Sequence, residues 1–195
     1  MPRLPKRVRK FLFGLLGAAL AVLFVLFLVP SAGSLSAIRQ DLEKVLYDFI
    51  SSQKENDQKS ILVFADIDRM KTINDMYGHL NGDLAIRATA EAFKRYSPKE
   101  WLFGRYGGDE FIAVGPCPET DTIEQQLRQI SESMNEEFKA LNLSFMLHAS
   151  IGYTVIEPGE EATIRDYIDR ADKYMYAEKE KYHKYIDSLT AESQK

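Results

Sequence analysis

Cysteine is almost absent from this chain of 195 residues, which contains a single one, Cys117. One cysteine cannot form a disulfide within the chain, and no paired Cys or Cys/His spacing suggests zinc. A reducing compartment fits this composition. The sequence therefore predicts a fold that relies on neither disulfides nor a zinc centre.

The chain also lacks an excess of basic residues. It has 25 Lys and Arg against 29 Asp and Glu, a formal net charge of −4. This balance gives no reason to expect nucleic-acid binding. An anionic substrate would have to be held locally, by a metal or by a few placed cations. The length suits one domain of ordinary size with an attachment.

Charged and strongly polar side chains are missing altogether from residues 11–29. As a helix rising 1.5 Å per residue, this stretch would be roughly 28 Å long, close to the hydrocarbon thickness of a bilayer. We predict a transmembrane helix over residues 11–30, preceded by a basic tail, residues 1–10. A signal peptide and a buried core helix remain the alternatives. The positive-inside rule applied to these flanks would keep the N-terminus in the cytoplasm and place the remainder outside.

The rest of the chain alternates between helical and strand-like patterns. Residues 31–57 are expected to form an amphipathic linker helix and a loop, residues 58–187 the domain, and residues 188–195 a polar tail. The order strand, helix, two strands, helix, strand, helix predicts an α/β fold, an α+β sandwich with a mixed central sheet flanked by helices. The expected strands cover residues 61–68, 101–106, 111–115 and 143–156, and the expected helices 34–53, 83–96, 122–141 and 163–182.

Acidic residues gather at two expected strand ends. Asp66 and Asp68 end the first strand, and Asp109 and Glu110 follow the glycine turn of the hairpin. A lone Asp-x-Asp is more often a solvated loop with a capping aspartate, and only one of its two carboxylates need reach a site. If the hairpin lies beside the first strand, however, the carboxylates converge. Oxygen ligands without His or Cys select Mg²⁺ or Mn²⁺, and Mg²⁺ typically combines one or two carboxylates with substrate phosphates.

The stretch between the strands could supply the other half of a nucleotide site. Lys71 is suited to balancing phosphate charge. Asn74 and Asp83 carry the amide and the carboxylate that pair with the edge of guanine. Each of these residues taken singly is more often a surface polar side chain, so the hypothesis depends on their joint arrangement.

These motifs resemble the GGDEF-domain diguanylate cyclases of bacteria, in a membrane-anchored form. The sequence "GGDEF" is intact at residues 107–111, and "DIDRMKTINDMYGHLNGD" follows the family's spacing. "RYGGDEF", "SIGY" and "RADKYMYAEK" match as well, and the resemblance covers about residues 58–185.

The resemblance implies condensation of two GTP molecules into cyclic di-GMP with release of pyrophosphate, by two-metal phosphoryl transfer. It implies Mg²⁺ or Mn²⁺, two ions per active site, and a homodimer in which each protomer binds one GTP. It also implies residue roles. Asp66, the main-chain carbonyl of Ile67 and Asp109 would bind the metal. Asp109 would also activate the 3′-hydroxyl with Glu110 in support, and Lys71 would stabilise the transition state. The substrate-binding residues would be Asn74, His79, Asp83 and Lys179.

The chain departs from the family pattern in several places. Tyr182 and His183 replace a Gly and a phosphate-contacting Arg, and Met70 replaces an aromatic residue. The family's product-inhibition site falls on Pro98 and Trp101, so feedback inhibition there is not expected, and the motif that usually precedes the domain is not recognisable. A catalytically weak or inactive GGDEF module that binds GTP or acts as a scaffold is the alternative function. A related cyclase using another purine is a third.

The expected location of the domain conflicts with the flanking charge. GTP is cytoplasmic, whereas the positive-inside rule places the domain outside. Because the substrate-binding pattern is more specific than the charge rule, we expect a membrane-anchored, single-pass protein with a cytoplasmic domain.

Overall fold

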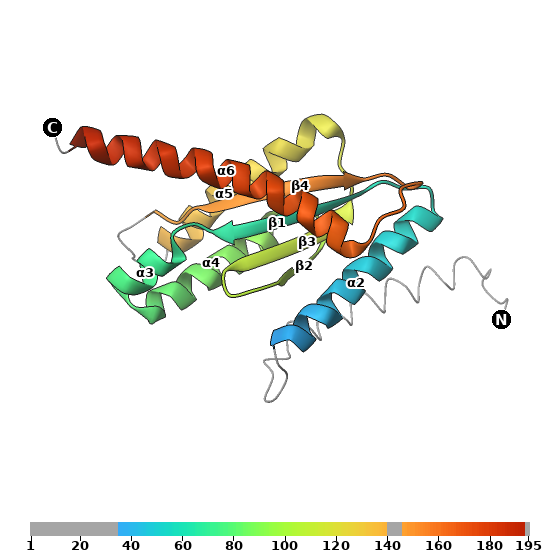
Figure 1. The fold of residues 1–195 in the computed structure, drawn as a ribbon, viewed down its shortest axis with the longest axis horizontal. Coiled ribbons are helices and arrows are strands. Elements are labelled where there is room, and N and C mark those ends of the chain that lie inside the picture. Colours follow the sequence, from blue (N-terminus) through green and yellow to red (C-terminus); the bar gives the residue numbers. More distant parts are fainter. Residues whose placement is uncertain (1–34, 140–145, 194–195) are drawn as a thin grey trace.

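The computed structural model describes residues 35–139 and 146–193. The expected transmembrane helix, residues 11–30, lies outside these ranges. Within them, no helix is both long and apolar enough to cross a bilayer. The described part of the chain forms five helices and four strands in this order (Figure 1): α2 (Leu35–Glu55), β1 (Ser60–Ile67), α3 (Met70–Tyr77), α4 (His79–Tyr96), β2 (Leu102–Arg105), β3 (Glu110–Pro116), α5 (Thr120–Lys139), β4 (Ala149–Ile156) and α6 (Ile164–Ser193).

The sheet has the strand order β2-β3-β1-β4. Every neighbouring pair in it is antiparallel, so the prediction of an α/β fold with helices around a sheet is confirmed, but the prediction of a mixed sheet is wrong. The reason lies in the helical crossovers. β1 and β2 run parallel, as do β3 and β4, but each such pair has another strand inserted between its members, as in split βαβ folds.

Alternating side chains divide β1 between two hydrophobic cores. Ile61, Val63 and Ala65 pack with α4 and α5 on one face of the sheet. Leu62 and Phe64 pack with α2 and α6 on the other. Successive strand residues point to opposite faces, so a strand buried on both sides becomes a continuous apolar run. That is the run from which the strand was predicted.

The expected linker helix is part of this packing. α2 buries Leu42, Leu46 and Ile50 against the sheet, at the i, i+4, i+8 spacing of a helix face. The helix is therefore seated on β3 and α6, and its orientation is fixed relative to the hairpin.

Three helices differ from the sequence prediction, and one of them, α4, begins at His79, four residues before the expected start. α3 was not predicted, because its eight residues are too few for a convincing periodic pattern. α6 continues past residue 182 to Ser193, into the expected polar tail. Ion pairs at i,i+3 and i,i+4, such as Lys181 with Glu178 and Lys184 with Glu180, stabilise this solvent-facing part of the helix.

Replacing Leu46 with Ala should lower the free energy of unfolding by about 2–5 kcal/mol, because Leu46 is fully buried between α2 and the sheet. Urea titration followed by the fluorescence of Trp101 measures the change. Leu80→Ala is the control, since 80% of Leu80 is exposed, and it should change stability by less than about 0.5 kcal/mol. Equal effects of the two substitutions would show that α2 is not packed on the domain.

Candidate nucleotide and metal site

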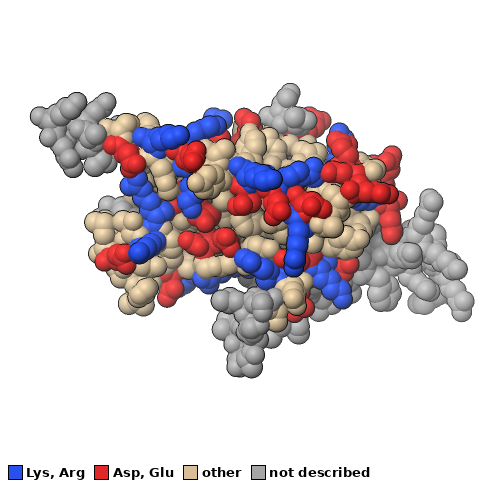
Figure 2. All heavy atoms as spheres, in the orientation of Figure 1, with Lys and Arg blue, Asp and Glu red and all other residues tan. Residues whose placement is uncertain are grey.

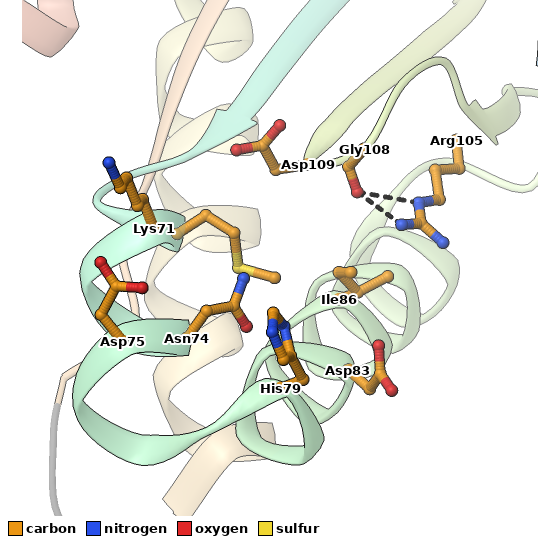
Figure 3. Close-up of a pocket in the computed structure, with 10 residues that line it drawn as sticks. Lys71, Asn74, Asp75, His79, Asp83, Ile86, Arg105, Gly108 and Asp109 are labelled. Carbon is orange, nitrogen blue, oxygen red and sulfur yellow. Dashed lines mark hydrogen bonds between the residues drawn. The ribbon is translucent and has the colours of Figure 1, made fainter.

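A cavity of about 480 Å³ lies between α3, α4 and the β2–β3 hairpin. Figure 3 shows its lining side chains, which come from all three of these elements. It contains five of the predicted site residues: Lys71, Asn74, His79, Asp83 and Asp109. Met70, Asp75, Ile86, Arg105 and Gly108 complete the lining.

Helical spacing aims the polar side chains of α3 and α4 into this cavity. Lys71 and Asn74 are three residues apart on α3, and His79 and Asp83 are four apart on α4, so each pair shares one helix face. Close packing of the two helices fixes the amide of Asn74. A Cβ atom added to Gly82 would lie 2.0 Å from Oδ1 of Asn74, so no larger residue fits without moving it.

The glycine turn is held by Arg105. Its Nε donates to the carbonyl oxygens of Gly107 and Gly108, both at 3.0 Å, and its Nη2 donates to Gly108 at 2.6 Å. Figure 3 shows the guanidinium beside Gly108 at the edge of the cavity. Arg105 therefore fixes the backbone that precedes Asp109.

The ends of β1 and β3 bring the predicted acids together. Asp66 is the register partner of Glu110, and the amide of Ile67 donates to the carbonyl oxygen of Asp109 at 3.1 Å. Asp66 and Glu110 continue the face that packs against α2 and α6, whereas Asp109 lines the cavity on the α3–α4 side. The acidic cluster therefore straddles the edge of the sheet.

Two cations from the covering helices face this cluster. Nζ of Lys179, on α6, lies 2.5 Å from Oδ1 of Asp66. Nη2 of Arg39, on α2, lies 3.2 Å from Oε2 of Glu110. Four predicted residues thus lie beside the cavity and not in its lining: Asp66, Ile67, Glu110 and Lys179.

Burial and repulsion from neighbouring carboxylates both raise the pKa values of Asp66 and Glu110. Burial raises the pKa of Asp66, and repulsion from Asp109 adds to this, while the hydrogen bond and charge of Lys179 oppose it. Burial alone would lower the pKa of Lys179, but the hydrogen bond and attraction of Asp66 outweigh it, so the pKa is raised. Burial likewise raises the pKa of Glu110, with Arg39 opposing. Burial is the largest cause of both raised carboxyl pKa values, and Lys179 and Arg39 offset it only in part.

The donor set fits a hard divalent cation. Asp66 and Asp109 supply carboxylate oxygens at adjacent strand ends. Ile67, which follows Asp66 directly, adds a main-chain carbonyl oxygen. Among the described residues, no group of three or more His, Cys, Asp or Glu side chains is placed to hold a metal. Two carboxylates without a complete protein cage suit Mg²⁺ or Mn²⁺ that takes further oxygens from phosphates or water.

Asp68 has a structural position away from the cavity. Its side chain is 1% exposed and accepts hydrogen bonds from Nδ1 of His148 at 2.7 Å and Oγ of Ser150 at 2.8 Å. The two family departures pack around it: Nε2 of His183 lies 3.2 Å from Oδ1 of Asp68, and the ring of Tyr182 stacks on His148 at 3.7 Å. Asp66, near the end of β1, therefore faces the acidic cluster, whereas Asp68, just after β1, is buried beside His148, Ser150 and His183.

Comparison with known proteins identifies the family. Residues 37–184 match the family model described as "Diguanylate cyclase, GGDEF domain", and the chain belongs to this family. It is 32% identical over 136 residues to the signaling protein YkoW of Bacillus subtilis and 28% identical over 142 residues to the diguanylate cyclase DgcP of Escherichia coli. These alignments cover 67% and 72% of the chain but 17% and 41% of the two longer proteins.

A solved structure supports the same assignment. The GGDEF domain of DgcB from Caulobacter crescentus, crystallised in complex with c-di-GMP, superposes with a TM-score of 0.65 at 27% identity. The superposition covers 73% of this chain and 84% of the DgcB domain. The expectation of a GGDEF-domain fold is confirmed.

Sequence reasoning missed Arg39 and the contacts of Arg105. Arg105 follows directly from the motif, since a cation two residues before a glycine turn can reach the turn carbonyls. Arg39 lies 71 residues from Glu110, and only the seating of α2 on the sheet brings the two together.

Replacing Lys179 with Met should raise the pKa of Asp66 further, because it removes the hydrogen bond and the charge that lower it. Carbon-13 NMR of the aspartate carboxyl groups measures this pKa. Lys173→Met removes an exposed lysine from the same helix and should leave the pKa of Asp66 unchanged. An Asp66 pKa that stays constant or falls in Lys179→Met would contradict the ion pair.

Proposed function

We propose that this protein is a diguanylate cyclase that condenses two GTP molecules into cyclic di-GMP and releases two pyrophosphates. The observation that carries the proposal is the position of Asp66 and Asp109 at the paired ends of β1 and β3, beside a cavity lined by Lys71, Asn74 and Asp83. The relatives named diguanylate cyclases and the c-di-GMP complex of DgcB support it.

The α3–α4 side of the cavity is suited to the guanosine part of GTP. The Asn74 amide serves the O6 and N7 edge of guanine, and the Asp83 carboxylate accepts from its N1–H and N2–H₂ groups. His79 lies between them and supplies a further polar contact to the nucleotide. Gly82 leaves free the space that the Asn74 amide occupies.

The hairpin side is suited to the triphosphate. Asp66, Asp109 and the carbonyl of Ile67 would hold Mg²⁺ or Mn²⁺, with two ions per active site in this proposal. When bound, such ions neutralise the charge on the phosphates and on the departing pyrophosphate. Lys71 adds a positive charge at the transferring phosphoryl group.

In each condensation step the 3′-oxygen of one GTP forms a bond to the α-phosphorus of the other, and the bond from that phosphorus to pyrophosphate breaks. Asp109 accepts the proton of the 3′-hydroxyl, with Glu110 in support. Because one cavity holds one GTP, the reaction requires two protomers facing each other, and we propose a homodimer.

The alternative is a catalytically weak or inactive module that binds GTP or serves as a scaffold. The contacts of α6 favour it: Lys179 is engaged by Asp66, and His183 lies against Asp68 and not in the cavity. Both residues stand where the family resemblance implies phosphate contacts. Binding of GTP without formation of pyrophosphate would select this alternative.

We also propose that the protein is membrane-anchored with its domain in the cytoplasm, because GTP is found there. Protease added to intact spheroplasts should leave the domain uncut, and its digestion from outside would overturn this placement.

Asp109→Asn should lower cyclic di-GMP formation by at least about 100-fold, because it removes both a metal ligand and the proposed proton acceptor. Mass spectrometry of the products formed from GTP and Mg²⁺ provides the measurement. Glu132→Gln, which neutralises an exposed acid on α5, is the control and should retain full activity. Retained activity in Asp109→Asn would refute the assignment of this carboxylate.

Asp83 should confer preference for the guanine 2-amino group. The wild-type protein should bind GTP about tenfold or more tightly than ITP, which lacks that group, because a hydrogen bond to a charged carboxylate is lost. Asp83→Asn should reduce the ratio to a few-fold, whereas Asp75→Asn, which alters another acid of the same cavity, should preserve it. Equilibrium binding by calorimetry measures the ratio, and equal affinity of the wild-type protein for both nucleotides would indicate another purine as substrate.

A further inference from the structure

Arg39 connects α2 to the glycine hairpin through three contacts. Its Nη2 donates to Oε2 of Glu110 at 3.2 Å, and its Nε donates to the carbonyl oxygen of Tyr106 at 3.4 Å. Its guanidinium carbon lies 4.0 Å from the centroid of the Tyr106 ring, in the geometry of a cation–π interaction. One side chain of the helix before the domain core therefore touches both flanks of the Gly107–Gly108 turn.

The Tyr106 ring, which the Arg39 guanidinium contacts, is itself held in place by two neighbouring side chains. The hydroxyl of Tyr106 donates to Oε1 of Glu43 at 2.7 Å, and its ring packs edge-on against Phe64 at 5.4 Å between centroids. Burial, together with the hydrogen bond to Glu43, raises the pKa of Tyr106 to about 12, so the hydroxyl remains a donor at neutral pH. Arg39 and Glu43 are four residues apart on α2, and they hold Tyr106 from one helix face.

The carboxylate of Glu110 has a defined place in this arrangement. A Cβ atom added to Gly107 would lie 2.1 Å from Oε2 of Glu110, the oxygen that pairs with Arg39. The carboxylate is therefore folded over the backbone of Gly107, in space that only glycine leaves free. Without Arg39, repulsion from Asp66 and Asp109 would act on a carboxylate with no counter-charge among the contacts described for it.

The contact contributes little to stability. The side chains of Arg39 and Glu110 are 44% and 33% exposed, and exposed ion pairs are screened by water and salt. The side chain of Arg39 is exposed, one turn before the buried Leu42, so the fold does not need it for packing. Its geometric effect on Glu110 is the larger consequence.

We propose that Arg39 is a positioning residue that orients the carboxylate of Glu110 beside the GGDEF turn. The inference rests on the proposed function for its catalytic consequence. A shift of α2 would move Arg39, and with it the carboxylate that supports the proton acceptor.

The test compares Arg39→Gln, Arg39→Lys and the control Lys44→Gln, which removes an exposed positive charge from the same helix, in the full chain. Arg39→Gln should lower kcat for GTP by about 10- to 100-fold, because small misplacements of catalytic groups are costly. KM should stay within about threefold, because no ground-state contact to GTP is removed. Arg39→Lys should restore part of kcat, and Lys44→Gln should match the wild-type protein. Turnover in Arg39→Gln equal to that of Lys44→Gln would overturn the proposal.

A second measurement does not depend on turnover. The amides of Tyr106 and Gly107 donate to the carbonyl oxygen of Glu110 at 2.8 and 3.2 Å, and their hydrogen exchange reports the order of the hairpin. Exchange at these two amides should be about tenfold faster in Arg39→Gln than in Lys44→Gln. If the wild-type protein forms no product but this acceleration is observed, the positioning contact stands and the proposed function fails. If the wild-type protein is active and exchange is unchanged, the positioning role fails alone.

Discussion

The pairing register of β1 with β3 is the constraint on which the candidate site depends. It sets Asp66 directly opposite Glu110 at the end of the sheet, and like charges in that position repel. A slip of β1 by one residue would turn Asp66 to the opposite face together with the apolar residues beside it. The register is therefore fixed by the burial of Leu62 and Phe64 on one face and of Val63 and Ala65 on the other.

The alternation of side chains along β1 and β3 also separates the nucleotide cavity on one side of the sheet from the ion-paired acids on the other. On the α3–α4 side it leaves a cavity with an amide, a histidine and carboxylates, into which Asp109 projects. On the α2–α6 side it places Asp66 and Glu110 beneath two helices that each bring one cation, Lys179 and Arg39. Figure 1 shows α6 crossing over the sheet and α2 lying beside it, and Figure 2 shows the basic and acidic side chains interspersed over one face of the molecule. On this face, acidic side chains have basic side chains as neighbours and do not lie opposite one large basic patch.

Sequence patterns predicted most of what is local. The apolar, β-branched run of β1 and the glycine turn marked the strand and the hairpin, and acids at their ends indicated a shared edge. The antiparallel order was not predicted, because chain order does not reveal that one strand inserts between two others. α3 was missed because eight residues between a strand and Gly78 show little periodicity. The contact of Arg39 with Glu110 depends on how α2 docks, which no local pattern specifies.

The substitution of His183 for the family's arginine changes how a triphosphate would be neutralised. In this chain the histidine ring lies against the buried carboxylate of Asp68 and helps to fix α6, while the donors of Arg105 point at turn carbonyls. Of the described cations beside the cavity, Lys71 and Lys179 remain for phosphate, and Lys179 is engaged by Asp66. A lysine has a flexible stem and three donors, so it can share its charge between Asp66 and a phosphate without a shift of the helix. In the proposed reaction, neutralisation of the triphosphate would therefore fall mainly on Lys71 and on the divalent ions that Asp66 and Asp109 would hold.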